Sequence, residues 1–189
     1  DDRAKTPWGD TRPDYGRGEV RSFIRDNAFY WLTDFNCDGL RWDSTCNIRN
    51  TSNGTGTDIP DGWSLLQWVN NDIDSQIPTK INIAEDLQNN DYLTKTTGAG
   101  GAGFDSQWDA QFVHPVRDAI IATNDTSRSM PAIRNAILHL YNGQQTQRVI
   151  YTESHDEVAN GSSRVPEEIW PGNAGSWASR KRSTLGAAL

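Results

Sequence analysis

The chain has 189 residues, of which 35% are apolar and 23% are charged, and its formal net charge is −7. This composition is typical of a globular protein, and no apolar run approaches the roughly 18 residues that a membrane helix requires. The 18 lysine and arginine residues are scattered rather than clustered. We therefore expect neither a nucleic-acid partner nor a membrane partner, and a neutral ligand instead.

The two cysteines, Cys37 and Cys46, are predicted to be free thiols. If the residues between them run largely extended at ~3.3 Å each, their separation exceeds the ~7 Å that a disulfide tolerates. Two cysteines alone do not complete a zinc site. We expect no metal and no cofactor. Free thiols and a polar N-terminal stretch without a signal peptide favour a cytoplasmic location. Because the chain begins with Asp1, we expect it to be part of a longer protein.

Helices and strands are predicted to alternate in the first half of the chain. After a turn-rich stretch over residues 1–17, apolar steps of three and four residues predict a helix of about seventeen residues from Glu19. A short strand follows at 39–43. A second helix begins near Trp63, after a loop, and Pro78 ends it.

The same rhythm continues to the end of the chain. The predicted elements are strands at 80–85, 104–108 and 147–153, helices at 110–122, 130–141 and 178–189, and a long loop at 155–176. Pro115 is expected to start or kink the helix at 110–122. Strands that alternate with helices of ten or more residues indicate βα units on a parallel sheet, so the predicted fold class is α/β.

The glycine-rich segment TTGAGGAGF, residues 96–104, is predicted to be a flexible connection. A phosphate-binding loop requires Lys-Ser/Thr after its glycines, and a dinucleotide-binding turn requires G-x-G-x-x-G directly after a strand. Neither context is present, so we reject a nucleotide-binding α/β protein.

Three of the four predicted strands end in charged residues. Ligands of parallel α/β proteins bind at the carboxyl ends of the strands, where the βα loops open. Acidic clusters from three strands are therefore expected to reach one face. These clusters are Arg41-Trp42-Asp43, Glu85-Asp86 and His155-Asp156-Glu157.

Side-chain alternation divides the first cluster between two faces of the sheet. Gly39, Arg41 and Asp43 are expected on the side of the candidate site, whereas Leu40 and Trp42 pack under the helices. Arg41 is expected to hold Asp43 ionised in a desolvated site, because a neighbouring cation lowers the pKa of a carboxyl. An ionised carboxylate suits a nucleophile.

Glu85 follows an apolar strand, and desolvation there is expected to raise its pKa, which suits a general acid. A retaining glycosidase uses one ionised carboxylate as nucleophile and one protonated carboxyl as general acid. Asp156, beside His155, is placed to hold substrate hydroxyls and to stabilise positive charge at the anomeric carbon. Each piece alone also has a structural interpretation, as a salt bridge, a helix cap or a surface residue. Their joint occurrence in this order favours catalysis.

Three segments resemble strand motifs of the alpha-amylase superfamily of glycoside hydrolases. DGLRWD resembles its fourth-strand motif, INIAED its fifth and YTESHDEV its seventh, while GFDSQWDAQFVH is similar to the sixth strand and its loop. YGRGEVRSF, NAFYWL and the order Ser-His-Asp-Glu-Val resemble the 1,4-alpha-glucan branching enzyme branch. The resemblance implies part of a (β/α)8 TIM barrel, about strands 4 to 7 with their helices. It implies one partial catalytic domain over residues 1–189, without the N- and C-terminal parts of the barrel.

The resemblance also implies residue roles. Asp43 is the nucleophile, Glu85 the acid and then the base, and Asp156 the transition-state stabiliser. Arg41 and His155 are implied neighbours in the subsite that holds the reacting glucose, and Asp86 is the rival of Glu85. Trp108 is either a substrate-side aromatic residue or a core residue. Two positions depart from the branching branch: Ser162 replaces its usual Lys, and Ser44 stands where Ala is common.

Two hypotheses of different classes follow. In the first, the parent is a retaining enzyme that cleaves α-1,4-glucosidic bonds of starch, glycogen or maltooligosaccharides by double displacement. It then transfers the glucan to a sugar hydroxyl or to water. The fragment alone is expected to be inactive, because a complete barrel needs about 250 residues, and to pair with the missing barrel half or with another copy. In the second, the chain is a non-catalytic carbohydrate-binding or assembly half-barrel.

Overall fold

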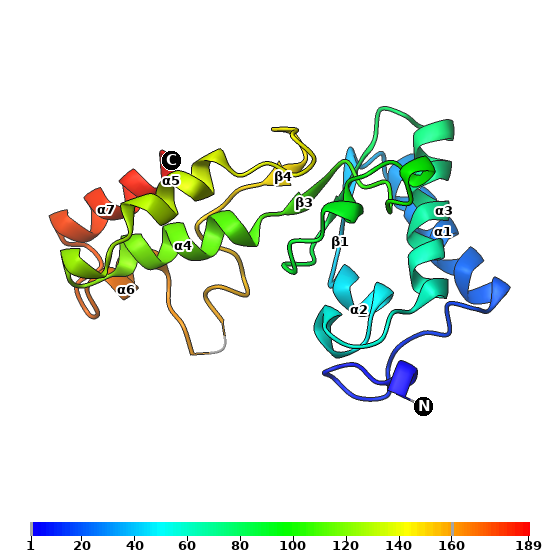
Figure 1. Cartoon of the computed structure of the whole chain (residues 1–189), viewed down its shortest axis with the longest axis horizontal. Coiled ribbons are helices and arrows are strands. Elements are labelled where there is room, and N and C mark those ends of the chain that lie inside the picture. The colour runs from blue at the N-terminus through cyan, green and yellow to red at the C-terminus, as the bar shows by residue number, and fades with distance from the viewer. Residues whose placement is uncertain (1, 160) are drawn as a thin grey trace. The chain divides into compact units, whose positions relative to one another are not determined.

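The computed structural model describes residues 2–159 and 161–189, which form two compact units (Figure 1). Unit 1 runs to Trp108 and includes Tyr141–Arg148, whereas unit 2 consists of Asp109–Leu140 and Val149–Leu189. Each unit has its own apolar core, and each is described separately below.

The sheet contains four short strands in the order β1-β2-β3-β4. β1 pairs with β2 in parallel, with Arg41 beside Ile83, and β2 pairs with β3 in parallel, with Ile83 beside Ser106. The α/β class and the parallel pairing are therefore confirmed. The strands are β1 Gly39–Trp42, β2 Ile81–Ala84, β3 Ser106–Trp108 and β4 Arg148–Val149. The expected strand at 147–153 is wrong in extent, because regular pairing ends at Val149.

Three α-helices belong to unit 1: α1 Gly18–Thr33, α2 Thr45–Arg49 and α3 Pro60–Gln76. The predicted helices correspond to α1 and α3. Pro60 occupies the first turn of α3, where its missing N–H costs no helical hydrogen bond. The five-residue helix α2 was not predicted, because it is too short to display a 3.6-residue period.

The core of unit 1 lies between the sheet and the helices α1 and α3, which run side by side in Figure 1. Leu40 and Trp42 of β1 pack against Leu32 of α1 and against Leu65 and Val69 of α3. This confirms the predicted alternation along β1. Leu40 and Trp42 face the helices, so Gly39 and Arg41 face the other side of the sheet.

The helices of unit 2 are α4 Ala110–Ile121, α5 Met130–Leu138, α6 Val165–Ile169 and α7 Trp177–Ala187. Its core contains Phe112, Val116 and Ile120 of α4 with Ala136 of α5 and Val165 of α6. The helix α4 begins at Ala110, where the Asp109 side chain accepts a hydrogen bond from the Gln111 N–H. Pro115 lies inside α4 and does not start it. The helix α6 lies within the stretch predicted to be a loop.

Single turns of 3₁₀-helix complete the described elements, at Asp2–Ala4, Ser52–Gly54, Asp91–Leu93, Thr97–Ala99 and Asp125–Ser127. Among the described residues, none of the helices is long and apolar enough to cross a membrane. Cys37 and Cys46 are both free, as predicted.

Candidate active site

The carboxyl end of β1 carries a salt bridge between two of the predicted site residues. Arg41 Nη1 donates a hydrogen bond to Asp43 Oδ1 at 2.5 Å. The Arg41 side chain is mostly buried, whereas 71% of the Asp43 side-chain surface is exposed. The desolvated surroundings expected for Asp43 are therefore absent in this chain, because its carboxylate extends beyond the last residue of the strand.

Glu85 follows β2, and its side chain is 11% exposed, as expected for a partly desolvated strand end. Glu85 Oε2 accepts a hydrogen bond from the Ser44 N–H at 2.6 Å and lies 3.7 Å from Arg41 Nη2. Ser44 adopts a left-handed conformation, with φ 47° and ψ 47°, which turns the chain from β1 into α2. One guanidinium thus contacts the carboxylates that follow two neighbouring strands.

The backbone of Glu85 is fixed by Thr45, the first residue of α2. Both the N–H and the hydroxyl of Thr45 donate to the Glu85 carbonyl, at 2.8 and 3.0 Å, and Thr45 is fully buried. A hydrogen bond that involves a buried backbone carbonyl restricts the position of the whole peptide unit. The α2 residues that sequence reasoning overlooked therefore position the candidate acid.

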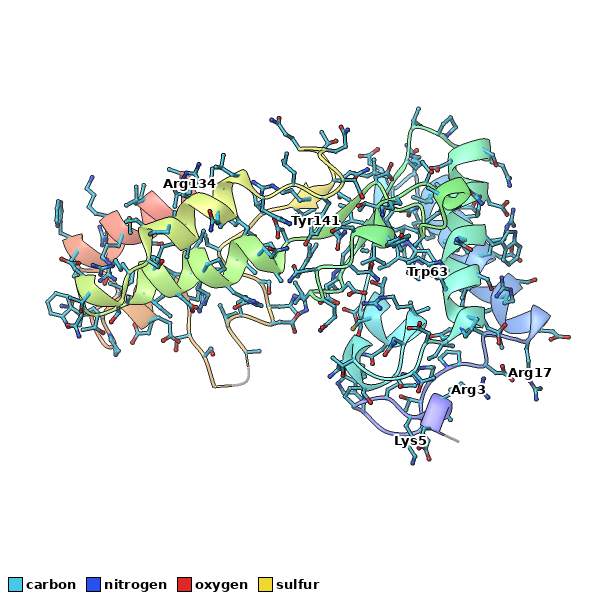
Figure 2. The ribbon with its side chains drawn as sticks, viewed as in Figure 1. Arg3, Lys5, Arg17, Trp63, Arg134 and Tyr141 are labelled. Atoms are coloured by element: carbon cyan, nitrogen blue, oxygen red, sulfur yellow. The ribbon has the colours of Figure 1, made fainter. Side chains whose placement is uncertain are left out.

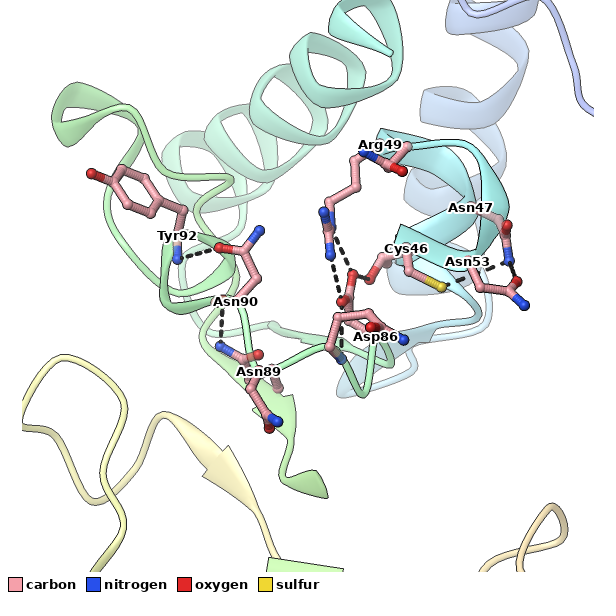
Figure 3. Close-up of polar contacts among 12 residues, drawn as sticks. Cys46, Asn47, Arg49, Asn53, Asp86, Asn89, Asn90 and Tyr92 are labelled. Atoms are coloured by element: carbon pink, nitrogen blue, oxygen red, sulfur yellow. Dashed lines mark hydrogen bonds and ion pairs between the residues drawn. The ribbon is translucent and has the colours of Figure 1, made fainter. Parts of the chain in front are cut away.

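Asp86, the rival of Glu85, has a different environment. Arg49 binds its carboxylate through two hydrogen bonds, Nε–Oδ2 at 2.9 Å and Nη2–Oδ1 at 2.8 Å, and the Asp86 side chain is fully buried (Figure 3). Thr45 Oγ1 lies 3.2 Å from the same carboxylate. Asp86 is thus committed to a buried bidentate pair, which favours Glu85 as the reactive carboxyl.

Trp108 shares the sheet face of Arg41 and Glu85. Arg41 is in register with Ile83, and Ile83 is in register with Ser106, so Glu85 and Trp108, each two positions further on, project to the same side. The Arg41 guanidinium carbon lies 4.4 Å from the centroid of the Trp108 ring. Of the two alternatives for Trp108, this cation–π contact favours the face of the candidate site.

His155 and Asp156 belong to unit 2, in a turn that follows β4. His155 Nε2 lies 3.2 Å from Asp156 Oδ2, and both side chains are more than half exposed. The Ser154 hydroxyl accepts a hydrogen bond from the Asp156 N–H at 3.2 Å. The structure therefore brings Arg41, Asp43, Glu85 and Trp108 together in unit 1 and pairs His155 with Asp156 in unit 2.

The segment that carries His155 and Asp156 is anchored by a residue that sequence reasoning missed. Arg117 of α4 is buried, and its guanidinium donates to the carbonyls of Thr152, Glu157 and Ser163 at 3.2, 3.2 and 2.7 Å. Its Nε also lies 3.7 Å from the Glu157 carboxylate. The available signal was that Arg117 falls on the apolar face of the helix predicted at 110–122, because a buried guanidinium requires acceptors.

Within residues 2–159 and 161–189, no group of three or more His, Cys, Asp or Glu side chains is arranged to hold a metal ion. The candidate site in this part of the chain is a pair of carboxylates, the mostly buried Glu85 and the exposed Asp43, which both contact Arg41.

Parallel strands with acidic residues at their carboxyl ends define an α/β protein with an acidic candidate site at the ends of its strands. The resemblance to the branching-enzyme branch of the alpha-amylase superfamily is confirmed by comparison with known proteins. The chain is 29% identical to a 1,4-alpha-glucan branching enzyme of Streptomyces avermitilis, over 89% of this chain and 31% of that enzyme. Similar enzymes of Oceanobacillus iheyensis and Fusobacterium nucleatum are each 28% identical, over 88% and 84% of this chain.

The chain spans about a quarter to a third of the length of these relatives, at 31%, 28% and 25%. No protein-family model matches it. The comparisons therefore show that the chain is similar to one part of these branching enzymes.

Proposed function

We propose that this chain is part of the catalytic (β/α)8 barrel of a retaining α-glucan-active enzyme, about strands 4 to 7 of that barrel. In this proposal both units belong to one partial catalytic domain. The parent protein cleaves α-1,4-glucosidic bonds and transfers the released glucan either to a sugar hydroxyl, which forms a branch, or to water.

The observation that carries the proposal is the contact of Arg41 with both Asp43 and Glu85. In the first step, Asp43 attacks the anomeric carbon while Glu85 protonates the departing glycosidic oxygen. In the second step, Glu85 removes the proton of the acceptor hydroxyl or water, which displaces Asp43 from the sugar. Asp156 stabilises the positive charge of both transition states.

Arg41, His155 and Trp108 bind substrate in this proposal. Arg41 holds the two carboxylates at the strand ends, and its stacking on Trp108 fixes the guanidinium plane against the sugar. His155 donates to a hydroxyl of the reacting glucose and keeps Asp156 oriented.

The partner of the chain, under the same proposal, is the remainder of the barrel or a second copy, and the substrate is starch, glycogen or a maltooligosaccharide. The 189-residue chain alone is inactive, since the described strands form an open sheet whose edges a closed barrel would pair. The free state of Cys37 and Cys46 supports a reducing, cytoplasmic location.

The test is turnover of amylose by the full-length parent, with new reducing ends counted against α-1,6 branch points. Branches without net new reducing ends indicate transfer to sugar, and reducing ends without branches indicate hydrolysis. The Asp43→Asn variant is expected to lose at least a thousandfold in kcat, because the nucleophile is removed. Asp38→Asn, a fully exposed aspartate before the same strand, is the matched control. Near-normal activity of Asp43→Asn contradicts the catalytic assignment and favours a non-catalytic carbohydrate-binding module.

A further inference from the structure

A pocket of about 360 Å³ lies in unit 1, and its lining residues do not include Arg41, Asp43 or Trp108. It is formed by the end of α2, the start of α3 and the loop that follows β2. The residues that bear on its chemistry are Arg49, Asp58, Trp63, Asn90 and Tyr92. Trp63 is labelled on α3 in Figure 2, and Figure 3 shows Asn90 and Tyr92 on one loop with Arg49 on a neighbouring segment.

Two aromatic rings line this pocket, and both are held in place. The Trp63 indole N–H donates to the Gly100 carbonyl at 3.3 Å, which fixes the ring across the glycine-rich connection. Tyr92 is 49% exposed, and the Lys95 ammonium lies 3.6 Å from the centroid of its ring. The cation occupies one face of the Tyr92 ring, so the opposite face is the one that a ligand can contact.

The polar groups of the pocket are oriented by hydrogen bonds that leave further donors and acceptors to a ligand. Asn90 Oδ1 accepts a hydrogen bond from the Tyr92 N–H at 3.0 Å, so the Asn90 side-chain nitrogen is the atom that can donate to a ligand. Asp58 Oδ1 accepts from Asn50 Nδ2 at 2.7 Å, and its second oxygen can accept from a hydroxyl. The backbone of Asn90 is also held, because the fully buried Gln107 donates to the Asn90 carbonyl at 3.0 Å.

The charges of the pocket favour a neutral ligand. Arg49 is committed to Asp86 through two hydrogen bonds, so its charge is compensated. The Asp58 carboxylate repels anions. Aromatic rings beside hydroxyl-binding groups, without an uncompensated cation among these five residues, match a sugar ring. Such a ring has apolar C–H faces and a rim of hydroxyls.

We propose that the pocket of Trp63, Tyr92, Asn90 and Asp58 is an accessory subsite that binds an α-glucan chain outside the reacting position. The identity of the sugar rests on the proposed function, whereas the site itself rests on the pocket. Arg49 lines the pocket and donates two hydrogen bonds to Asp86, the residue after Glu85. The subsite and the candidate acid are therefore both connected to the carboxyl end of β2. A long glucan is then held at a second point while one of its bonds reacts.

The experiment is calorimetric titration of the 189-residue chain with maltoheptaose. Tyr92→Ala is expected to weaken binding at least fivefold, since it removes a ring that stacks on the sugar, and Tyr92→Phe is expected to retain the affinity. Asp58→Ala, at an exposed position, is expected to weaken binding severalfold. Tyr30→Ala is the matched control, because Tyr30 is 48% exposed and lies on α1.

The subsite is overturned if the unaltered chain does not bind maltoheptaose at millimolar concentration, or if Tyr92→Ala and Asp58→Ala both bind like the unaltered chain. These outcomes differ from failure of the proposed function, which is judged by turnover of the parent. If the Asp43→Asn parent remains active while Tyr92→Ala loses binding, the catalytic assignment fails and the subsite stands.

Discussion

Arg49 and Asp86 form a bidentate ion pair that is almost entirely removed from solvent, with side-chain exposures of 9% and 0%. Burial disfavours the charged Arg49, but the hydrogen bonds that Arg49 donates to Asp86 and the negative charge of that carboxylate outweigh this and raise the pKa of the arginine. The pair ties α2 to the end of β2, one residue beyond the candidate acid Glu85. The two adjacent carboxylates thus lie in different surroundings, because successive residues at the end of a strand point to opposite sides.

Replacement of Asp86 is expected to destabilise the fold. Asp86→Asn leaves the Arg49 guanidinium buried without its counter-charge, and breaking a buried pair in this way costs about 3–5 kcal/mol. Urea denaturation followed by circular dichroism measures the free energy of unfolding. A loss below about 1 kcal/mol would show that solvent or another group compensates Arg49.

Replacement of Glu85 is expected to have the opposite effect, with little change in stability and a large loss of activity. Glu85→Gln retains an oxygen that can accept the Ser44 N–H, so the free energy of unfolding should change by less than about 1.5 kcal/mol. In the parent protein the same variant should lose most of its turnover, because an amide cannot donate the proton that the leaving oxygen requires. If the Glu85→Gln parent remains active, a residue other than Glu85 is the general acid.

Gly39 is expected to resist substitution because β2 approaches it closely. A Cβ added at Gly39 would lie 2.4 Å from the Ile81 carbonyl oxygen, and a backbone atom of a paired strand cannot move aside cheaply. Gly39→Ala should destabilise the chain by about 1–3 kcal/mol, as other overpacked sites do. Gly18→Ala is the matched control, since a Cβ at the start of α1 meets nothing within 4 Å. Equal midpoints of urea denaturation for both variants would contradict the strand spacing.

Stability at low pH is expected to depend on Glu153. Burial favours the neutral form of this carboxyl, but hydrogen bonds from Arg164 and from the Val165 N–H outweigh it, so the pKa of Glu153 is lowered. The unfolded chain has a glutamate pKa of about 4.3 and therefore binds this proton first on acidification. The contribution is complete above that pH and is lost as pH falls through the lowered folded value.

The comparison is between the unaltered chain and Glu153→Gln, with midpoints of urea denaturation measured from pH 6 to pH 3. The unaltered chain should lose stability more steeply over this range. Glu19→Gln, which replaces an exposed glutamate of α1, controls for the change in net charge. Parallel curves for the unaltered chain and Glu153→Gln would mean that the Arg164 pair contributes nothing.

Loss of Arg117 is expected to release the segment that carries His155 and Asp156. Arg117→Met preserves the apolar stem within α4 but leaves the carbonyls of Thr152, Glu157 and Ser163 without their donor. Amide hydrogen exchange over residues 152–163 should accelerate at least tenfold, while exchange in α1 is unchanged. Uniform acceleration throughout the chain would indicate general unfolding instead of a local anchor.

The sequence by itself determined the class of the fold and the residues of the candidate site. Apolar periods located α1, α3, α4, α5 and α7, since helices of nine or more residues repeat their pattern often enough to be recognised. Alternation along residues 39–43 correctly separated Arg41 from Trp42. The motifs around Asp43, Glu85 and Asp156 predicted the kind of relative that the comparisons found.

Only the tertiary structure showed which of the two adjacent carboxylates, Asp86, is held in a buried ion pair and which residue holds it. Asp86 and Glu85 are adjacent and equally acidic in the sequence, and the choice between them depends on Arg49, which is distant in the chain and lies in the short helix α2. The stacking of Trp108 on Arg41 likewise depends on the register of paired strands, and the exposure of Asp43 depends on where β1 ends. Such contacts join residues far apart in the sequence, where neither periodicity nor local composition carries a signal.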